Sequence, residues 1–225
     1  MKDFKLDELL KELCVERKIF NSEADFQFAL AWKIKENYKD FKVFLEYYFD
    51  TGESEKEKKS KMYVDIMLKK DDRFIPIELK YRKKKLKKVY KDDYSNQEIF
   101  LTEQSAQDQG RYWFLYDVHR IEKIKDILGE RFEKGYAVFL TNDKSYKTAP
   151  TKKTKCYDFR IDEKRGVIEK NTFLNWAEDT AESSKGNGGF ELKNNYYLNW
   201  ENYSILPDYE YDDSRVFNYL LIPIE

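Results

Sequence analysis

Two acids whose side chains could together hold a metal ion, Asp65 and Glu78, lie close in the sequence to a lysine, Lys80. They belong to the stretch Met62–Tyr81, MYVDIMLKKDDRFIPIELKY, in which apolar residues recur at every second position. If the chain reverses in the middle of KKDDR, antiparallel pairing places Asp65 directly opposite Glu78, and Lys80 shares their face of the sheet. Two facing carboxylates repel each other, so the arrangement favours a cation between them. A divalent metal would supply it.

The same stretch predicts two strands joined by a tight turn. The alternating apolar residues are Val64, Ile66 and Leu68 on the first strand, and Ile75, Ile77, Leu79 and Tyr81 on the second. Asp71 and Asp72 provide polar turn chemistry between them. Pro76 lacks a backbone N–H, which indicates a bulge or a locally unpaired position. A bulge there would shift the register by one residue and separate Asp65 from Glu78.

A helix predicted over Glu23–Tyr38 precedes the strand pair. Ser22 followed by Asp25 resembles a capping box, which is typical of a helix start. Its apolar arc consists of Phe26, Leu30, Ala31, Ile34 and Tyr38. Glu23 and Gln27 fall inside that arc. Glu23 either favours the helix N-terminus electrostatically and stays hydrated, or serves the site, and the sequence leaves both interpretations open.

A dense basic run, RKKKLKKVYK, follows the strand pair at Arg82–Lys91 and includes Lys83, Lys84 and Lys85. Such runs are commonly solvated charged segments. Because this one begins directly after Lys80, contact with phosphate groups is the competing interpretation.

A long helix is predicted from a cap at Thr102 to Leu128. Gln104 and Gln107, one turn apart on it, could hydrogen-bond a phosphate or a water, although ordinary helix-surface polarity is the simpler explanation. Asp117 lies on the apolar stripe, where a structural ion pair with Arg111 or Arg120 is favoured over a catalytic role.

Other elements are expected along the chain. They are a helix over residues 6–19, strands at Lys42–Phe49, Gly135–Asn142 and Val216–Ile224, a short strand at Tyr157–Ile161 and a helical turn at Phe173–Asp179. No internal repeat and no second core are visible, so a single domain over residues 1–225 is predicted.

Composition narrows the function classes. With 42 Lys and Arg against 43 Asp and Glu, the formal net charge is −1, so any binding of nucleic acid must come from local patches. Cys14 and Cys156 are far apart, which excludes a zinc motif and fits a reducing cytoplasm. His119 is the only histidine, so a multi-histidine metal site is excluded and a serine–histidine hydrolase is disfavoured. The sequence shows no signal peptide and no membrane-spanning run, so a cytoplasmic location away from membranes is expected.

The arrangement of Asp65, a short turn and Glu78-Leu79-Lys80 resembles the motif of the PD-(D/E)XK nuclease superfamily. The Glu23 helix resembles the first helix of that core, and the segment Gln104–Ile124 is similar to small uncharacterised bacterial members. The usual proline before the first aspartate is replaced by Val64. The resemblance implies an α/β restriction-endonuclease-like fold, with a central mixed sheet and an antiparallel catalytic hairpin flanked by helices. The core would span roughly 20–142 and a C-terminal elaboration 143–225.

The resemblance also implies roles for individual residues. Asp65, Glu78 and the backbone carbonyl of Leu79 would hold Mg²⁺, for which Mn²⁺ can substitute, and Glu23 would contribute through water or bind a second metal. Lys80 would position or deprotonate the attacking water, or stabilise charge on the phosphate.

The implied function is Mg²⁺-dependent hydrolysis of phosphodiester bonds in DNA or RNA, in defence or nucleic-acid processing. The alternative is a nuclease-fold protein without chemistry that works as a nucleic-acid- or protein-binding regulatory module. The sequence does not choose between DNA and RNA, and a homodimer stays open.

Overall fold

The computed structural model describes residues 4–50, 62–150, 154–207, 210 and 212–225. Among these residues, a mixed sheet has the strand order β1-β2-β3-β6-β12-β11. Its strands are β1 (Lys42–Phe49), β2 (Met62–Lys70), β3 (Arg73–Arg82), β6 (Gly135–Thr141), β11 (Trp200–Ile205) and β12 (Val216–Ile224). Neighbours pair antiparallel, except that β3 and β6 are parallel. The chain is therefore a mixed α/β protein with a central mixed sheet.

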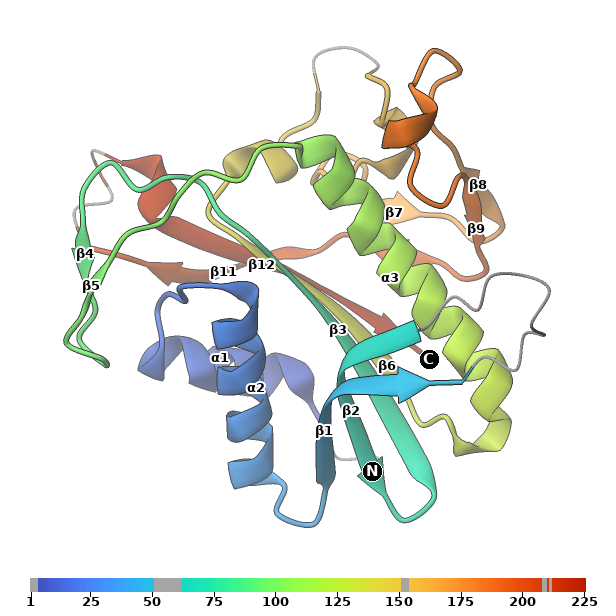
Figure 1. Cartoon of the computed structure of the whole chain (residues 1–225), viewed down its shortest axis with the longest axis horizontal. Helices are drawn as coiled ribbons and strands as arrows, with labels where there is room; N and C mark the ends of the chain where they lie inside the picture. The colour runs from blue at the N-terminus through green and yellow to red at the C-terminus, as the bar shows by residue number, and fades with distance from the viewer. Residues whose placement is uncertain (1–3, 51–61, 151–153, 208–209, 211) are drawn as a thin grey trace.

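Helices cover both faces of this sheet (Figure 1). One face carries α1 (Leu6–Glu16) and α2 (Glu23–Asn37), and the other carries α3 (Gln107–Leu128). Because both faces are covered, every residue of β6 is buried. No helix in the described ranges combines the length and apolarity needed to cross a lipid bilayer.

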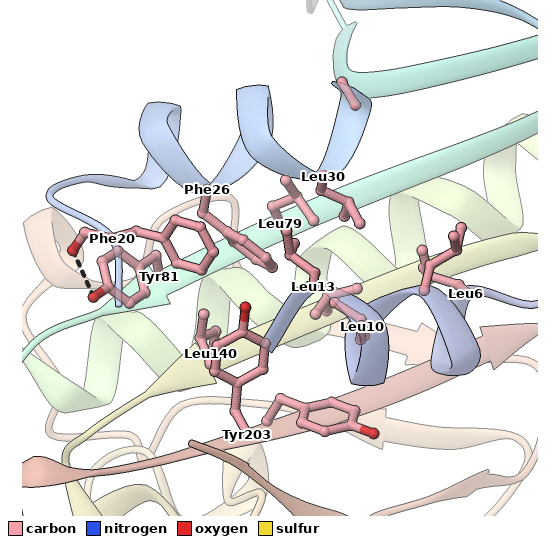
Figure 2. Close-up of a cluster of buried hydrophobic side chains, with 14 of the residues drawn as sticks. Leu6, Leu10, Leu13, Phe20, Phe26, Leu30, Leu79, Tyr81, Leu140 and Tyr203 are labelled. Carbon is pink, nitrogen blue, oxygen red and sulfur yellow. Dashed lines mark hydrogen bonds between the residues drawn. The ribbon is translucent and has the colours of Figure 1, made fainter. Parts of the chain in front are cut away.

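Alternation along β3 sorts its side chains between the two faces. Ile75, Ile77, Leu79 and Tyr81 all enter the cluster beneath α1 and α2, as their spacing predicts. Figure 2 shows Leu79 and Tyr81 among Phe20, Phe26 and Leu13, with the Tyr81 hydroxyl donating to the Phe20 carbonyl at 2.8 Å. The intervening residues Glu78 and Lys80 must then face α3. This alternation delivers the two charged side chains to the opposite side of the sheet.

The start of α2 follows the predicted capping pattern. Ser22 Oγ accepts a hydrogen bond from the Asp25 backbone N–H at 3.1 Å. The adjacent Glu23 begins the helix and is thereby fixed at its N-terminus.

Replacing the cap should destabilise the protein. Ser22→Ala leaves an N–H of the first turn without its acceptor, so we expect the free energy of unfolding to fall by about 1 kcal/mol. Urea unfolding measures this change. Ser22→Asp keeps an acceptor and should remain near wild type, and an equal loss in both variants would show that the cap is not the cause.

Several boundaries differ from the sequence prediction. The first helix ends at Glu16 instead of residue 19, and α3 begins at Gln107, so Thr102 is not its cap. Ala106 precedes α3 with φ +66°, a left-handed conformation that cannot continue a helix backward. The predicted strand at Tyr157–Ile161 is instead a 3₁₀ turn at Tyr157–Phe159. The predicted helical turn at Phe173–Asp179 is wrong, because Thr172–Leu174 forms a strand paired with Phe190–Leu192.

Shorter elements complete the described chain. The short strands are β4 (Tyr90–Lys91), β5 (Glu98–Ile99), β7 (Val167–Ile168), β8 (Thr172–Leu174), β9 (Phe190–Leu192) and β10 (Tyr196–Tyr197). The 3₁₀ turns are Gly129–Arg131, Lys144–Tyr146, Tyr157–Phe159, Glu182–Ser184 and Asp213–Arg215. The region 143–225, expected to be an elaboration of the core, also supplies β11 and β12 to the central sheet.

Candidate active site

The candidate site forms where β2 separates from β3. The predicted register holds from Lys70↔Arg73 to Ile66↔Ile77, without a shift at Met67↔Pro76. Pro76 is accommodated because alternate N–H groups of β3 point to opposite sides, and its nitrogen points toward β6, with which β3 pairs only from Ile77 onward. Of the two alternatives expected at Pro76, a bulge and a locally unpaired position, the register excludes the bulge.

Pairing between β2 and β3 nevertheless stops before Asp65 and Glu78. The sequence predicted that these two residues are strand partners, and this prediction is wrong. Before Ile66, the N-terminal part of β2 bends toward α3 together with the C-terminal part of β1 (Figure 1). Val64 accordingly packs beneath α3, not with Ile66 and Leu68 as their alternation predicted. The bend lies beside Glu46 of β1, whose φ is +48°. The residues on either side of Glu46 pair with Ile66 and Val64 of β2, but Glu46 itself does not pair with Asp65.

Gln27 secures this bend. Its Nε2 donates both to Glu46 Oε1 at 2.8 Å and to the Asp65 carbonyl at 2.7 Å. Gln27 is buried, so these bonds replace the water that a separated strand would otherwise need.

Where β2 no longer pairs with β3, three side chains accept the backbone hydrogen bonds that a neighbouring strand would otherwise accept. The N–H of Leu79 donates to Asp65 Oδ2 at 2.6 Å, and the N–H of Tyr81 donates to Glu23 Oε2 at 2.7 Å. The N–H of Lys83 donates to Gln104 Oε1 at 3.0 Å. We call Asp65, Glu23 and Gln104 the side-chain ladder. It brings Asp65 and Glu23 to the same edge, two residues apart along β3.

Glu78 and Lys80 meet two residues of α3 on the other side of the site. Lys80 Nζ lies 2.7 Å from Asp117 Oδ2, and Arg120 Nη2 lies 3.3 Å from Glu78 Oε1. Asp117 Oδ1 also binds Arg120 Nη1 at 3.1 Å. Glu78 is 2% exposed and Asp117 equally so. Two acids and two cations therefore alternate across the interface between β3 and α3.

Asp117 and Arg120 are site residues that sequence reasoning undervalued. Their mutual ion pair was among the two pairs expected from the helix spacing. Their contacts with Glu78 and Lys80 join residues about forty positions apart in the sequence. The periodicity of a helix cannot predict such contacts with another element. The only available sign was an aspartate on an otherwise apolar stripe.

Burial and charge set the protonation of the site. Burial raises the pKa of Asp65 to about 6, against the opposing effect of Lys80. Burial, and then the neighbouring Asp117, raise the pKa of Glu78 well above its usual range. Burial alone would lower the pKa of Lys80, but Asp117, Glu23 and Asp65 together raise it above its ordinary value. Lys80 is therefore a permanent cation near neutral pH and is poorly suited to act as a base.

The oxygen donors of the site bear on whether it can bind Mg²⁺. No group of three or more acids, cysteines or histidines in the described residues converges at metal-binding distance. Mg²⁺, however, commonly uses one or two carboxylates with water. Glu78 Oε1 is buried and makes no hydrogen bond to any described residue, which leaves it available as a ligand. The Leu79 carbonyl points to the same place, where it accepts from Lys80 Nζ at 3.1 Å. Glu78 and the Leu79 carbonyl therefore offer oxygens of the kind that Mg²⁺ binds, and Asp65 lies next to them on the Leu79 N–H. Lys80 and Arg120, which now contact these oxygens, would have to yield to the metal.

A polar cavity of about 310 Å³ gives access to the site. It is lined by Glu23, Lys80, Tyr81, Arg82, Gln104, Trp113, Asp117 and Arg120. Asp65 and Glu78 do not line this cavity, and Glu78 is buried beside Arg120, which does.

The residues expected to contact nucleic acid do not all lie at the candidate site. Gln104 lies before α3 and binds Lys83, so it is not one helical turn from Gln107 as predicted. Gln107 begins α3, donates to Asp143 at 3.2 Å and lines a separate cavity of about 620 Å³ that Lys84 also lines. Lys83 Nζ donates to the Asn21 carbonyl at 2.7 Å, and Lys85 is exposed. Gln104 alone of these borders the candidate site directly.

Comparisons with protein-family models, with curated proteins and with solved structures gave no significant match.

Proposed function

We propose that the protein is a Mg²⁺-dependent nuclease with a restriction-endonuclease-like core, which hydrolyses phosphodiester bonds of DNA or RNA. One observation carries the proposal: Asp65, Glu78, Lys80 and Glu23 gather where β2 leaves β3, although they come from three separate elements. Acids held together in a largely buried place at a cost to stability are typical of functional sites.

Each residue has a role that follows from its contacts. Mg²⁺ bound by Asp65, Glu78 and the Leu79 carbonyl would supply Lewis-acid stabilisation of phosphate charge and an acidified water. Lys80 remains charged and can stabilise negative charge that develops on the phosphate. Glu23 is half-buried and uses one oxygen for the Tyr81 N–H, so its other oxygen can orient a water.

A second function has its own supporting observation. The side-chain ladder gives Asp65, Glu23 and Gln104 a structural task that requires no metal. A nuclease-fold module that binds nucleic acid or protein without cutting would retain these contacts. Binding without cleavage is the result that would favour it.

Loss of either metal-binding acid should abolish cleavage. Asp65→Asn and Glu78→Gln each remove a negative charge while retaining shape, so we expect at least a 100-fold lower cleavage rate. The assay uses end-labelled single- and double-stranded DNA and RNA, with Mg²⁺ and then with EDTA.

The matched control is Asp93→Asn, the same chemical change at an exposed aspartate in the turn between β4 and β5. It should cleave like wild type. Activity that persists equally in Asp65→Asn, Glu78→Gln and EDTA would place the cleavage elsewhere and contradict the proposal.

A further inference from the structure

The cavity above the site carries positive charge on its lining. Lys80, Arg82 and Arg120 face it, against the acids Glu23 and Asp117. Lys80 and Arg120 both have ion pairs with Asp117. The charge of Arg82 is not compensated in this way.

The Arg82 guanidinium has no ion pair or hydrogen bond with any side chain or carbonyl in the described chain, and its Nε is buried. A buried donor on a cation is costly to leave unmatched. The planar arginine fork matches the oxygens of a phosphate. Arg82 is thus an uncompensated cation on the lining of a cavity whose ligand should be an anion.

Arg120 makes three contacts of unequal quality. It donates to the Tyr63 carbonyl, pairs with Asp117 at 3.1 Å and approaches Glu78 Oε1 at 3.3 Å. The Glu78 approach is not a hydrogen bond, since Glu78 Oε1 lacks such a partner in the described residues. The weakest contact of Arg120 is therefore the one with Glu78, the proposed metal ligand.

We infer that Arg82 and Arg120 form the seat of a nucleic-acid phosphate, and that Arg120 leaves Glu78 for this phosphate when a divalent metal binds Glu78. The metal part of this inference rests on the proposed function. Arg120 can make the exchange because it lines the cavity already, while Asp117 keeps hold of its other nitrogen. Trp113, which also lines the cavity, offers a ring for the adjoining base.

The exchange couples two binding events. Arg120 and the metal compete for Glu78 in the free protein, and a phosphate relieves this competition by drawing Arg120 away. By linkage, the metal must strengthen phosphate binding by the same factor. Removal of Arg120 should therefore have opposite effects on the two ligands, which an arginine remote from both of them would not produce.

The test measures two affinities without turnover. Mn²⁺ alone is titrated calorimetrically into wild type and Arg120→Gln, and short fluorescent oligothymidine or oligouridine is titrated in EDTA. We expect Arg120→Gln to bind Mn²⁺ about tenfold more tightly and the oligonucleotides about tenfold more weakly. Arg82→Gln should weaken only the oligonucleotides.

Lys123→Gln is the matched control, since it removes the same charge from an exposed position one turn away on α3. It should change each affinity less than about threefold. Arg120→Lys retains the charge if Arg120→Gln folds poorly, and it should shift both affinities in the same directions by less.

Unchanged Mn²⁺ affinity in both Arg120 variants, or absence of Mn²⁺ binding in all proteins, would overturn the inference. So would unchanged oligonucleotide affinity in the Arg82 and Arg120 variants. Opposite shifts in a protein that never cleaves would support this inference and contradict the nuclease proposal, so the two failures are distinguishable.

Discussion

At pH 8 and without metal, Asp65→Asn is expected to be more stable than wild type, with a free energy of unfolding about 1–3 kcal/mol higher. Burial raises the pKa of Asp65 from 3.8 to about 6, so the folded state binds this proton more tightly than the unfolded state. Its contribution to stability is complete below pH 3.8 and is lost as the pH rises to 6. Above pH 6 the protein holds an ionised carboxylate that disfavours folding. Asparagine removes that charge and still accepts from the Leu79 N–H.

Urea unfolding in EDTA at pH 4 and at pH 8 measures this effect. The two proteins should differ little at pH 4, and Asp93→Asn should match wild type at both values. A constant difference across the range would mean that the carboxylate's charge is not responsible. Because the same variant should lose cleavage, a more stable but inactive protein would separate catalysis from folding.

Lys80→Met is expected to destabilise the protein by about 3–5 kcal/mol at pH 8. The ammonium lies 2.7 Å from Asp117 and also offsets the charges of Glu23 and Asp65. Methionine fills similar space, so the loss reports charge more than packing. Protonation of Asp65 near pH 6 relieves part of the repulsion, and the loss should therefore be smaller at pH 5.

Denaturant unfolding at pH 5 and pH 8 gives both numbers. Lys123→Met removes an exposed lysine from α3 and should stay within about 0.5 kcal/mol of wild type. Equal losses at the two pH values would assign the effect to packing and contradict the electrostatic explanation.

The hairpin shows how much the sequence can predict. Alternating apolar residues and a polar turn are local signals, and they gave the register from Lys70↔Arg73 to Ile66↔Ile77 correctly. The same signals missed the departure of β2 at Asp65, because it depends on Gln27 and Glu46 from other elements. The alternation of residues along one strand does not show where the adjacent strand stops pairing with it.

In the site, too, the sequence predicts what depends on local spacing and misses what depends on contacts between elements. The shared face of Glu78 and Lys80 follows from a period of two, and the structure retains it. Their partners on α3 depend on how the helix lies across the sheet, which no local pattern determines. Gln104 was misplaced for a related reason: a left-handed residue at Ala106 ends the helix pattern there, and residue types alone did not indicate it.

The side-chain ladder has a consequence for association between molecules. A strand edge with free N–H groups is a template for pairing with another chain, and thus for aggregation. Along β3, carboxylates and an amide already occupy those donors, and two of the three are positions where an incoming strand would meet negative charge. The separation of β2 from β3 therefore leaves the N–H groups of Leu79, Tyr81 and Lys83 satisfied and unavailable for pairing with a neighbouring protein.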